Sequence, residues 1–356
     1  MFEHCSFSRF LVTLILQFQM QFVPKSVPPN PLSIKRLAEL VSASNQTLAL
    51  TGAGMSTESG LPDYRSEGVG LYARTDRRPM EYQTFLRSEV SRKFYWARNF
   101  IAWPYFSQVE PNGGHYLLSQ WALNNRLFGI ITQNVDRLHH RAGPGRILEL
   151  HGCSHRVICL KCGHISERSE LQKRFMELNP SWSKYGATKK ELAIAPDGDV
   201  ELPLDVVQNF KKLSRQSPLK EVGIDKSYNY TNAGISQEHS SKPHYLIVFF
   251  YDYQVPSCTQ CLDGILKPDV TFFGENLPPA IKAEAAALVD QADLLLCLGT
   301  SVQTFSSFRL LLQANQLRIP IAIVNIGPTR ADNMAGLIIN SRIFTTLKQV
   351  DQLIAN

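Results

Sequence analysis

The segment from Thr51 to Arg65 combines closely spaced glycines with an unusual density of polar side chains. It follows an apolar run, and Gly52 and Gly54 permit tight φ values and a close approach of the backbone to a ligand. Exposed N–H groups in such a turn can hold a pyrophosphate. A structural turn does not need the polar residues that follow, which are Ser56, Ser59, Asp63 and Arg65 beside Pro62. The segment therefore indicates a nucleotide site.

The glycine spacing differs from the dinucleotide fingerprint of ordinary dehydrogenases. That fingerprint is G-x-G-x-x-G, whereas the next glycine of this chain is Gly60. No acidic residue stands alone at the end of a second strand, and no group suited to hydride transfer lies near the fourth apolar run. An NAD-dependent dehydrogenase is therefore the weaker interpretation.

A second group of polar side chains follows the apolar run that ends at residue 132. Gln133, Asn134 and Asp136 lie at the end of an expected buried strand, where amide and carboxylate groups face a ligand rather than the core. His151 precedes Gly152, and a histidine beside a glycine is an accessible general base whose unperturbed pKa lies near neutrality. A structural role is the alternative for His151 when it is considered alone. His139 and His140 are predicted to be packing or surface residues.

The third constellation is a set of four cysteines in two Cys-x-x-Cys pairs. Cys159 and Cys162 form one pair, and Cys258 and Cys261 form the other. Four thiolates at this spacing predict a closed tetrahedral zinc site, which is structural rather than catalytic. Disulfides and buried free thiols suit the spacing less well, and a disulfide framework leaves three further cysteines to explain, namely Cys5, Cys153 and Cys297.

Four short apolar runs must position these groups. Each is followed by Gly, Asn or Ser, and the segments span 47–54, 127–136, 294–301 and 319–327. Continuous apolar strands with polar loops at their carboxyl ends are typical of parallel sheets that are buried on both faces. The pattern predicts a doubly wound α/β domain. It also predicts two insertions, because a crossover helix needs far fewer residues than separate the runs.

Composition excludes several classes of protein. The chain has 356 residues, 44% of them apolar and 19% charged, so neither a small disulfide scaffold nor bulk disorder fits. The net charge of +6 comes from dispersed basic residues, and a nucleic-acid-binding zinc protein needs more Lys and Arg near its cysteines than this chain has. The longest apolar run, 10–22, is interrupted by glutamines and is shorter than the roughly 20 residues of a membrane helix.

Two segments stand apart from the expected domain. Prolines at 24, 28, 29 and 31 mark a linker, so the folded body is expected to start near residue 31. Residues 211–253 are polar and rich in turn residues before they end in LIVFFYDY. Long loops inside compact domains are uncommon, so this segment is predicted to be disordered or adventitious. An extra edge strand is the alternative for its apolar end.

Several motifs together resemble the sirtuins, which are NAD-dependent protein deacylases. The resemblance covers residues 31–350 apart from 211–253, and the motifs occur in the family's order: GAGMSTESGLPDYR, TQNVD, ELHG, the two cysteine pairs, LKPDVTFFGE, LGTS and VNIGPTR. The segments FVPKSVPP, GLYARTDRRP and YWARNF are similar to the class II branch. This chain departs from the family pattern in the 211–253 segment, in CLDG at 261–264 where Cys-Gly-Gly is usual, and at Ile343 where a Cys is common.

The resemblance implies a Rossmann-like domain formed by about 31–56, 127–152 and 266–350. The second, smaller domain would combine a helical module, about 57–126, with a zinc module, about 153–265, and NAD and an acyl-lysine would meet in the cleft. Residues 1–30 would be a targeting or linker segment, but this presequence is atypical. The mitochondrial matrix is therefore implied by the resemblance alone. NAD and one structural zinc per chain are the implied cofactors.

The resemblance also assigns roles to single residues. Asn134 and Asp136 would engage nicotinamide and ribose, and His151 would deprotonate a ribose hydroxyl so that the acyl group moves to the sugar. The other implied cofactor-binding residues are Gly52, Ala53 and Gly54 at the phosphates, Ser56, Asp63, Tyr64, Arg65 and Tyr72 in and around the cofactor loop, Gln133 and Val135, Gly299, Thr300 and Ser301, Asn325, Ile326 and Gly327, and Ile343.

The implied activity is removal of acyl groups from lysine, with lipoyl, biotinyl or other bulky groups favoured over acetyl. Acyl-lysine proteins, among them mitochondrial metabolic enzymes, would be the substrates, with neither nucleic acid nor a membrane as partner. Mono-ADP-ribosyl transfer is one alternative, because it begins by breaking the same glycosidic bond. A zinc scaffold that senses NAD without turnover is the other.

Overall fold

The computed structural model describes residues 20–75, 78–182, 194–200 and 253–355. The chain divides into two compact units. Unit 1 consists of Met1–Ala73, Val109–Gly152 and Leu277–Asn356, and unit 2 consists of Arg74–Gln108 and Cys153–Asn276. The predicted disordered segment 211–253 lies outside the described residues except for Tyr253, as does most of the apolar run 10–22.

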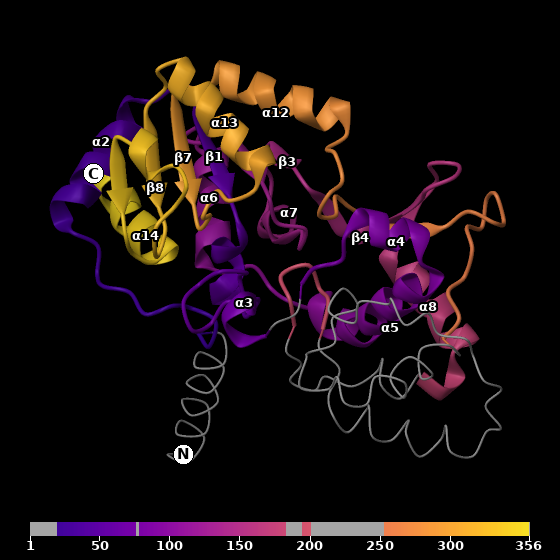
Figure 1. Ribbon diagram of the computed structural model, residues 1–356. Coiled ribbons are helices and arrows are strands. Elements are labelled where there is room, and N and C mark those ends of the chain that lie inside the picture. The colour runs from indigo at the N-terminus through magenta and orange to yellow at the C-terminus, as the bar shows by residue number, and fades with distance from the viewer. Residues whose placement is uncertain (1–19, 76–77, 183–193, 201–252, 356) are drawn as a thin grey trace, which may run out of the picture. The chain divides into compact units, whose positions relative to one another are not determined.

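Unit 1 contains a parallel sheet of six strands in the order β3-β2-β1-β7-β8-β9 (Figure 1). Numbered within this sheet, the order is 3-2-1-4-5-6, which is the Rossmann order, so the prediction of a doubly wound fold is confirmed. The four predicted strands form the centre of the sheet and two short strands form its edges. Their bounds are β1 Thr47–Thr51, β2 Gly129–Thr132, β3 Ile147–Glu149, β7 Leu294–Leu298, β8 Ile321–Val324 and β9 Leu337–Ile339.

Helices cover both faces of this sheet, which explains why the central strands are apolar throughout. Successive side chains of a strand point to opposite faces. Ala49 accordingly packs in one cluster with α2 (Pro31–Ala43), α6 (Gly113–Leu123) and α14 (Ile343–Ile354), while Leu48 and Leu50 pack in another with α12 (Pro279–Gln291) and α13 (Phe305–Gln316).

Among the described residues, packing on unit 1 begins before residue 31, where the folded body was predicted to start. Helix α2 starts where expected, since the Asn30 side chain accepts a hydrogen bond from the Leu32 N–H at 2.8 Å. The preceding segment is nevertheless packed: Phe22 is buried, and the Ser341 hydroxyl donates to the Val27 carbonyl at 2.8 Å. The prolines therefore mark an extended segment that lies on unit 1 rather than a free linker.

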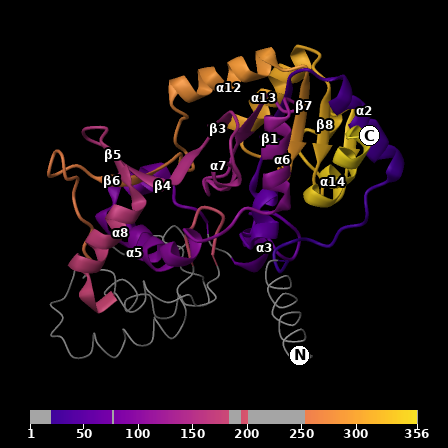
Figure 2. The same cartoon turned by 180° about the vertical axis from the view of Figure 1, so that it is seen from behind.

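Unit 2 is built from helices and a three-stranded sheet in the order β5-β4-β6 (Figure 2). Its helical core is aromatic, with the rings of Trp96, Phe100, Phe175 and Tyr253 packed together. The bounds are α4 Tyr82–Arg87, α5 Glu89–Phe106, α8 Arg168–Leu178, η2 Pro180–Trp182, β4 Gly152–Cys159, β5 Ile165–Glu167 and β6 Leu266–Val270; the remaining short elements of the chain are η1 Ala53–Ser59, α3 Leu71–Arg74, α7 Leu138–Ala142 and η5 Asp332–Met334.

The two units differ from the predicted domain boundaries at two places. Helix α6 lies within the expected helical module, but Leu117, Leu118 and Trp121 pack in the core of unit 1. Strand β6 lies within the expected Rossmann-like domain, but it pairs in the small sheet of unit 2. Among the described residues, no helix is both long and apolar enough to cross a membrane.

Candidate active site

The loops after β1 and β7 lie against each other at the point where the strand order of the sheet reverses. The Gly52 N–H donates to the Leu298 carbonyl at 3.1 Å, and the Gly54 N–H donates to the Gly299 carbonyl at 2.9 Å. A Cβ atom on Gly52 would lie 2.7 Å from the Thr300 Cβ, and one on Gly54 would lie 2.9 Å from the Gly299 Cα. Open α/β sheets bind ligands at this switch point.

A tight φ, predicted from the sequence for Gly52, is not what the structure shows there. Gly52 has a φ of −136°, an extended conformation that other residues adopt readily. Close approach of the two loops, and not a tight φ, therefore requires glycine at position 52. Gly299 does have a positive φ of 58°, and a Cβ there would lie 2.5 Å from the Met55 nitrogen.

Ser56 joins the two polar residues predicted to engage nicotinamide and ribose. Its hydroxyl donates to the Asp136 carboxylate at 2.6 Å and accepts from the Asn134 side-chain amide at 3.0 Å. The same amide donates to the Gly52 carbonyl at 3.0 Å. All three side chains are buried. They form a preorganised polar cluster, since each hydrogen bond fixes the next side chain.

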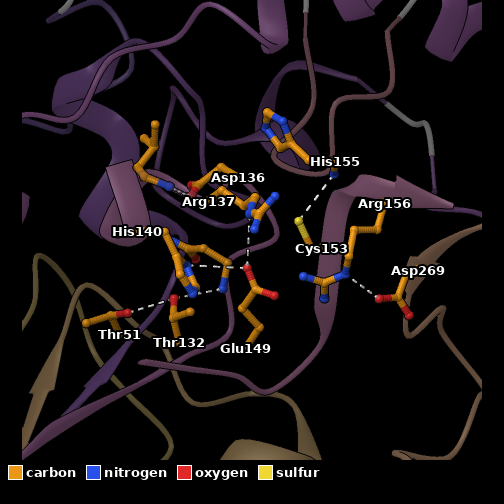
Figure 3. A network of polar contacts seen from close by, with 12 residues as sticks. Thr51, Thr132, Asp136, Arg137, His140, Glu149, Cys153, His155, Arg156 and Asp269 are labelled. Atoms are coloured by element: carbon orange, nitrogen blue, oxygen red, sulfur yellow. Dashed lines mark hydrogen bonds and ion pairs between the residues drawn. The ribbon is translucent and has the colours of Figure 1, made fainter. Parts of the chain in front are cut away.

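The ionisation of Asp136 is balanced by opposing effects. Burial raises the pKa of Asp136, and hydrogen bonds from the Ser56 hydroxyl and the Leu138 N–H act to lower it. Glu149 also raises it; that carboxylate lies 4.0 Å from the Arg137 guanidinium and 3.5 Å from the His140 Nδ1 (Figure 3). The result is a carboxylate that is easier to protonate than an exposed one.

Gln133 connects the loops after β1, β2 and β7. Its side-chain amide donates to the Thr300 hydroxyl at 2.8 Å and to the Thr51 carbonyl at 3.2 Å. Its side-chain oxygen accepts from the Thr304 hydroxyl at 3.2 Å. Gln133 therefore acts as a cross-link at the carboxyl edge of the sheet.

His151 is held by hydrogen bonds at both ring nitrogens. Its Nδ1 lies 3.1 Å from the Gln133 carbonyl oxygen, and its Nε2 lies 2.8 Å from the Ser306 hydroxyl. Burial lowers the pKa of His151 to about 4, against the opposing effect of the Gln133 carbonyl. The imidazole is therefore neutral at pH 7, as a general base must be.

The predicted cofactor loop after η1 is closed on itself by Asp63. Its carboxylate accepts from the backbone N–H of Arg65 at 2.9 Å and of Ser66 at 2.7 Å. The Arg65 guanidinium lies over the ring of Tyr72 at 5.5 Å, and the rings of Tyr64 and Tyr72 are 5.8 Å apart. These contacts bring together the four loop residues that the resemblance assigned to cofactor binding.

A pocket in unit 1 brings together a second set of the predicted residues. Gly54, Asp63, Gly299, Asn325, Ile326 and Ile343 line it. The sequence did not predict its other lining residues, which are Val23, Pro24, Thr57, Glu58, Ser66, Ser341 and Arg342. An ion pair of 2.8 Å between Glu58 and Arg342 could have been anticipated only from the fold, because 283 positions intervene.

The remaining predicted residues lie beside these two groups. Ala53 begins η1, and Val135 is buried between the predicted ligand-binding residues of its loop. The Ser301 carbonyl accepts from the Arg330 N–H at 3.0 Å, while the Gly327 N–H donates to the Asn340 side chain at 3.1 Å. The short helix η1 connects the polar cluster with the pocket, since the Ser56 hydroxyl donates to Asp136 while Thr57 and Glu58 line the pocket.

Two histidines lie buried behind the site. His115 accepts at Nδ1 from the Asn112 N–H at 3.2 Å, and His139 lies with its Nε2 3.0 Å from the Thr51 hydroxyl, which donates to the Thr132 hydroxyl at 2.8 Å. The two rings are 4.7 Å apart. Burial lowers the pKa of His139 to about 3 and that of His115 well below its ordinary value. The prediction that His139 is a packing residue is confirmed.

The four predicted metal ligands cluster in unit 2. Their sulfur atoms all lie within 4.8 Å of one another, and the Cys159–Cys261 and Cys162–Cys258 sulfurs are 3.6 Å and 3.7 Å apart. These distances exclude disulfides. Tetrahedral zinc with bonds of about 2.3 Å places its sulfurs roughly 3.8 Å apart, so the four thiols fit the ion. A Cβ at Gly264 would lie 2.2 Å from the Cys159 sulfur, so glycine is required beside the cluster.

Comparison with known proteins agrees with this geometry. The Sir2 family model matches residues 52–306. The chain is 43% identical to the cattle protein named "NAD-dependent protein lipoamidase sirtuin-4, mitochondrial", over 93% of this chain and 89% of that one, and it is equally identical to the human protein of that name, over 93% and 90%. The Drosophila melanogaster protein "NAD-dependent protein deacylase Sirt4" is 38% identical, over 91% and 88%.

Solved structures share the fold at low sequence identity. A structure described as "Sir2-p53 peptide-NAD+" matches with a TM-score of 0.57 and 22% identity, covering 90% of this chain and 98% of that one. Another, described as "Structural Basis for the Mechanism and Regulation of Sir2 Enzymes", matches with a TM-score of 0.59 and 24% identity, covering 91% and 100%. The family model and the relatives, together with the glycine loops and the cluster around Asn134, show that the chain belongs to the Sir2 family.

Proposed function

We propose that this chain is an NAD-dependent protein-lysine deacylase in which His151 is the general base. The observation that carries the proposal is the state of His151: a neutral imidazole whose Nδ1–H points to the Gln133 carbonyl and whose unprotonated Nε2 lies beside the Ser306 hydroxyl and can accept a proton. Gln133 begins the loop that also carries Asn134 and Asp136. A scaffold without turnover has no need for a base held in this way.

The residues of unit 1 fit NAD as a substrate. The glycine at position 54 lets a ligand approach the backbone closely, and the pocket at Asn325 and Ile343 offers a partly apolar wall. NAD supplies the ribose. The acyl oxygen of the lysine amide would displace nicotinamide from one ribose carbon, and the acyl group would later move to a ribose hydroxyl. Asn134 and Asp136 would orient that ribose, and His151 Nε2 would take the hydroxyl proton. Holding both reactants can contribute roughly 7–11 kcal/mol to lowering the barrier.

The names of the relatives support a choice of acyl group and of cellular compartment. The cattle and human proteins are named as mitochondrial lipoamidases, which supports bulky acyl groups such as lipoyl or biotinyl over acetyl, and a mitochondrial location for this chain. Within the mitochondrion we place it in the matrix, acting on acylated metabolic enzymes. Mono-ADP-ribosyl transfer to protein remains the second candidate, because cleavage of the same glycosidic bond would start both reactions.

Mass spectrometry of the purified chain with NAD and a panel of acyl-lysine peptides, from acetyl to lipoyl, tests the proposal. Formation of nicotinamide, free lysine and O-acyl-ADP-ribose is the expected result. Nicotinamide release with a gain of mass on protein would instead favour ADP-ribosyl transfer, and no consumption of NAD would favour a scaffold.

The variant His151→Ala tests the base separately. It should still bind NAD but lose about 10²- to 10⁴-fold in acyl transfer, the usual contribution of a general base. Unchanged turnover in this variant would exclude His151 from that role.

A further inference from the structure

Ser306 donates a hydrogen bond to the nitrogen of His151 that must accept a proton. The Gln133 carbonyl, 3.1 Å from Nδ1, can only accept, so Nδ1 carries the hydrogen of the neutral imidazole. Nε2 is then a bare acceptor. The Ser306 hydroxyl lies 2.8 Å from it and must be the donor. This hydrogen bond fixes both the tautomer and the ring orientation.

The two groups that hold the imidazole are themselves connected. Ser306 lies in the first turn of α13, directly after Thr304 at the helix N-cap and Phe305. The Thr304 hydroxyl donates to the Gln133 side chain at 3.2 Å, and the amide of the same side chain donates to Thr300 at 2.8 Å. Gln133, whose carbonyl accepts from His151 Nδ1, therefore also holds Thr304 in place and so resists displacement of Ser306.

We propose that Ser306 is a positioning residue for the general base, acting through His151 and not on the acyl group. The inference rests on the proposed function. Ser306 is only half-buried, so a ribose hydroxyl can take its place as donor to Nε2. When the proton moves from the ribose oxygen to Nε2, the imidazolium carries an N–H at each edge. The Gln133 carbonyl accepts from one, and the Ser306 oxygen can now accept from the other.

The role predicts an effect on one step of the reaction. Cleavage of the bond to nicotinamide precedes the proton transfer to His151, whereas formation of O-acyl-ADP-ribose depends on it. Loss of the Ser306 hydroxyl should therefore slow product formation and spare cleavage. A residue that only stabilised the fold would change both steps together.

The experiment compares two rates in the full-length chain with NAD and an acyl-lysine peptide. The first is exchange of labelled nicotinamide into NAD, and the second is formation of O-acyl-ADP-ribose. In Ser306→Ala the second rate should fall roughly 3- to 10-fold, which corresponds to one hydrogen bond, while the first stays within about 2-fold of wild type. Gln313→Ala is the matched control, because Gln313 is in the same helix but its side-chain amide donates to the Ala286 carbonyl and to Asp290 of α12; its ratio of the two rates should equal that of wild type.

A second pair of variants keeps the test decisive if alanine disturbs α13. Ser306→Thr and Ser306→Val have nearly the same shape and differ in the hydroxyl, so only the threonine variant should recover product formation. Equal ratios of the two rates in these variants would overturn the role of Ser306 while the proposed function stands. A wild-type chain that neither exchanges nicotinamide nor forms product would overturn the proposed function and this inference with it.

Discussion

Among single residues, the buried imidazoles of His115 and His139 should make the folded chain less stable in acid. Burial lowers the pKa of His139 to about 3, and the pKa of His115 is lowered as well, with His139 as a further cause. The unfolded chain therefore binds more protons than the folded chain below about pH 6.5. Stability should fall as the pH drops from 6.5 towards 3. Between pH 7 and 5, His139 alone should remove about 2 kcal/mol from the free energy of unfolding.

Urea unfolding at pH 7 and pH 5 measures this effect. His139→Gln retains a donor for Thr51 but cannot titrate, so the loss between the two pH values should be smaller by that amount. The control is His164→Gln, which removes a histidine of unit 2; His140 is unsuitable because it contributes to the lowered pKa of His139. The same loss in wild type and His139→Gln would contradict a neutral buried imidazole.

At this scale the sequence predicted the residue types of the site better than their partners. Gly52, Asn134, Asp136 and His151 all lie at the carboxyl edge of the sheet. Ser306 was missed because a serine in an unremarkable helical turn carries no signal until the fold places it 155 positions away in sequence from the ring it contacts. Contacts of this kind depend on tertiary packing, which periodicity and spacing do not encode.

Among the elements, the two cysteine turns of unit 2 should depend on a metal ion. They join β4 and β6 through backbone hydrogen bonds, among them Leu160 N–H to the Ile265 carbonyl at 2.9 Å. Leu262 has a positive φ of 67° beside the cluster, a conformation that costs a leucine roughly 1–2 kcal/mol. Structural zinc contributes about 10–16 kcal/mol to the folding of small modules, which is ample to hold such a turn.

Chelation of the purified chain should therefore release one zinc per chain and unfold unit 2. Cys159→Ser should do the same without a chelator, because it removes one ligand. Cys153→Ser is the matched control: this cysteine is buried in the same strand, but its sulfur accepts from the His155 N–H and is not part of the cluster. Mass spectrometry measures the loss of zinc, and thermal unfolding measures the loss of stability. A Cys159→Ser chain that stays folded and free of metal would show that the site is not structural.

The elements could be predicted where one signal dominated. The central strands of unit 1 are apolar on both faces, so their runs were visible in the sequence. The edge strands β3 and β9 have three residues each, too few to form a pattern. Helix α6 was predicted in the helical module but packs in the core of unit 1, because its apolar face indicates burial but not the partner that buries it.

For the whole molecule, Tyr253 is the point where the 211–253 segment enters the core. Its ring is fully buried, 4.8 Å from Trp182 and 5.5 Å from Phe175, and the next residue is fixed by the Gln254 N–H to Asn179 at 2.7 Å. The hydroxyl is buried and has no hydrogen-bond partner among the described residues. Burial raises the pKa of Tyr253 well above its ordinary value, so the phenol stays neutral. A phenylalanine would fill this site without an unsatisfied hydroxyl.

The sequence offers that phenylalanine at the other end of the segment. Deleting 211–253 joins Phe210 to Gln254, so an aromatic residue again precedes Gln254. We expect this variant to fold and to remain active, with a stability equal to or above that of wild type. Deleting 210–252 keeps Tyr253 itself, and this variant should behave like the variant that lacks 211–253.

Deleting 210–253 removes one residue more than the first variant and joins Asn209 to Gln254. No aromatic ring then fills the core between Trp182 and Phe175, and losing a buried aromatic side chain costs about 3–5 kcal/mol. Thermal unfolding and deacylase turnover of the three deletions separate the possibilities. If all three are inactive or insoluble, residues between Phe210 and Tyr253 have a function of their own. If all three are equally stable, the aromatic site is dispensable. Loss of stability in the third variant alone would show that the segment can be removed as long as one aromatic residue precedes Gln254.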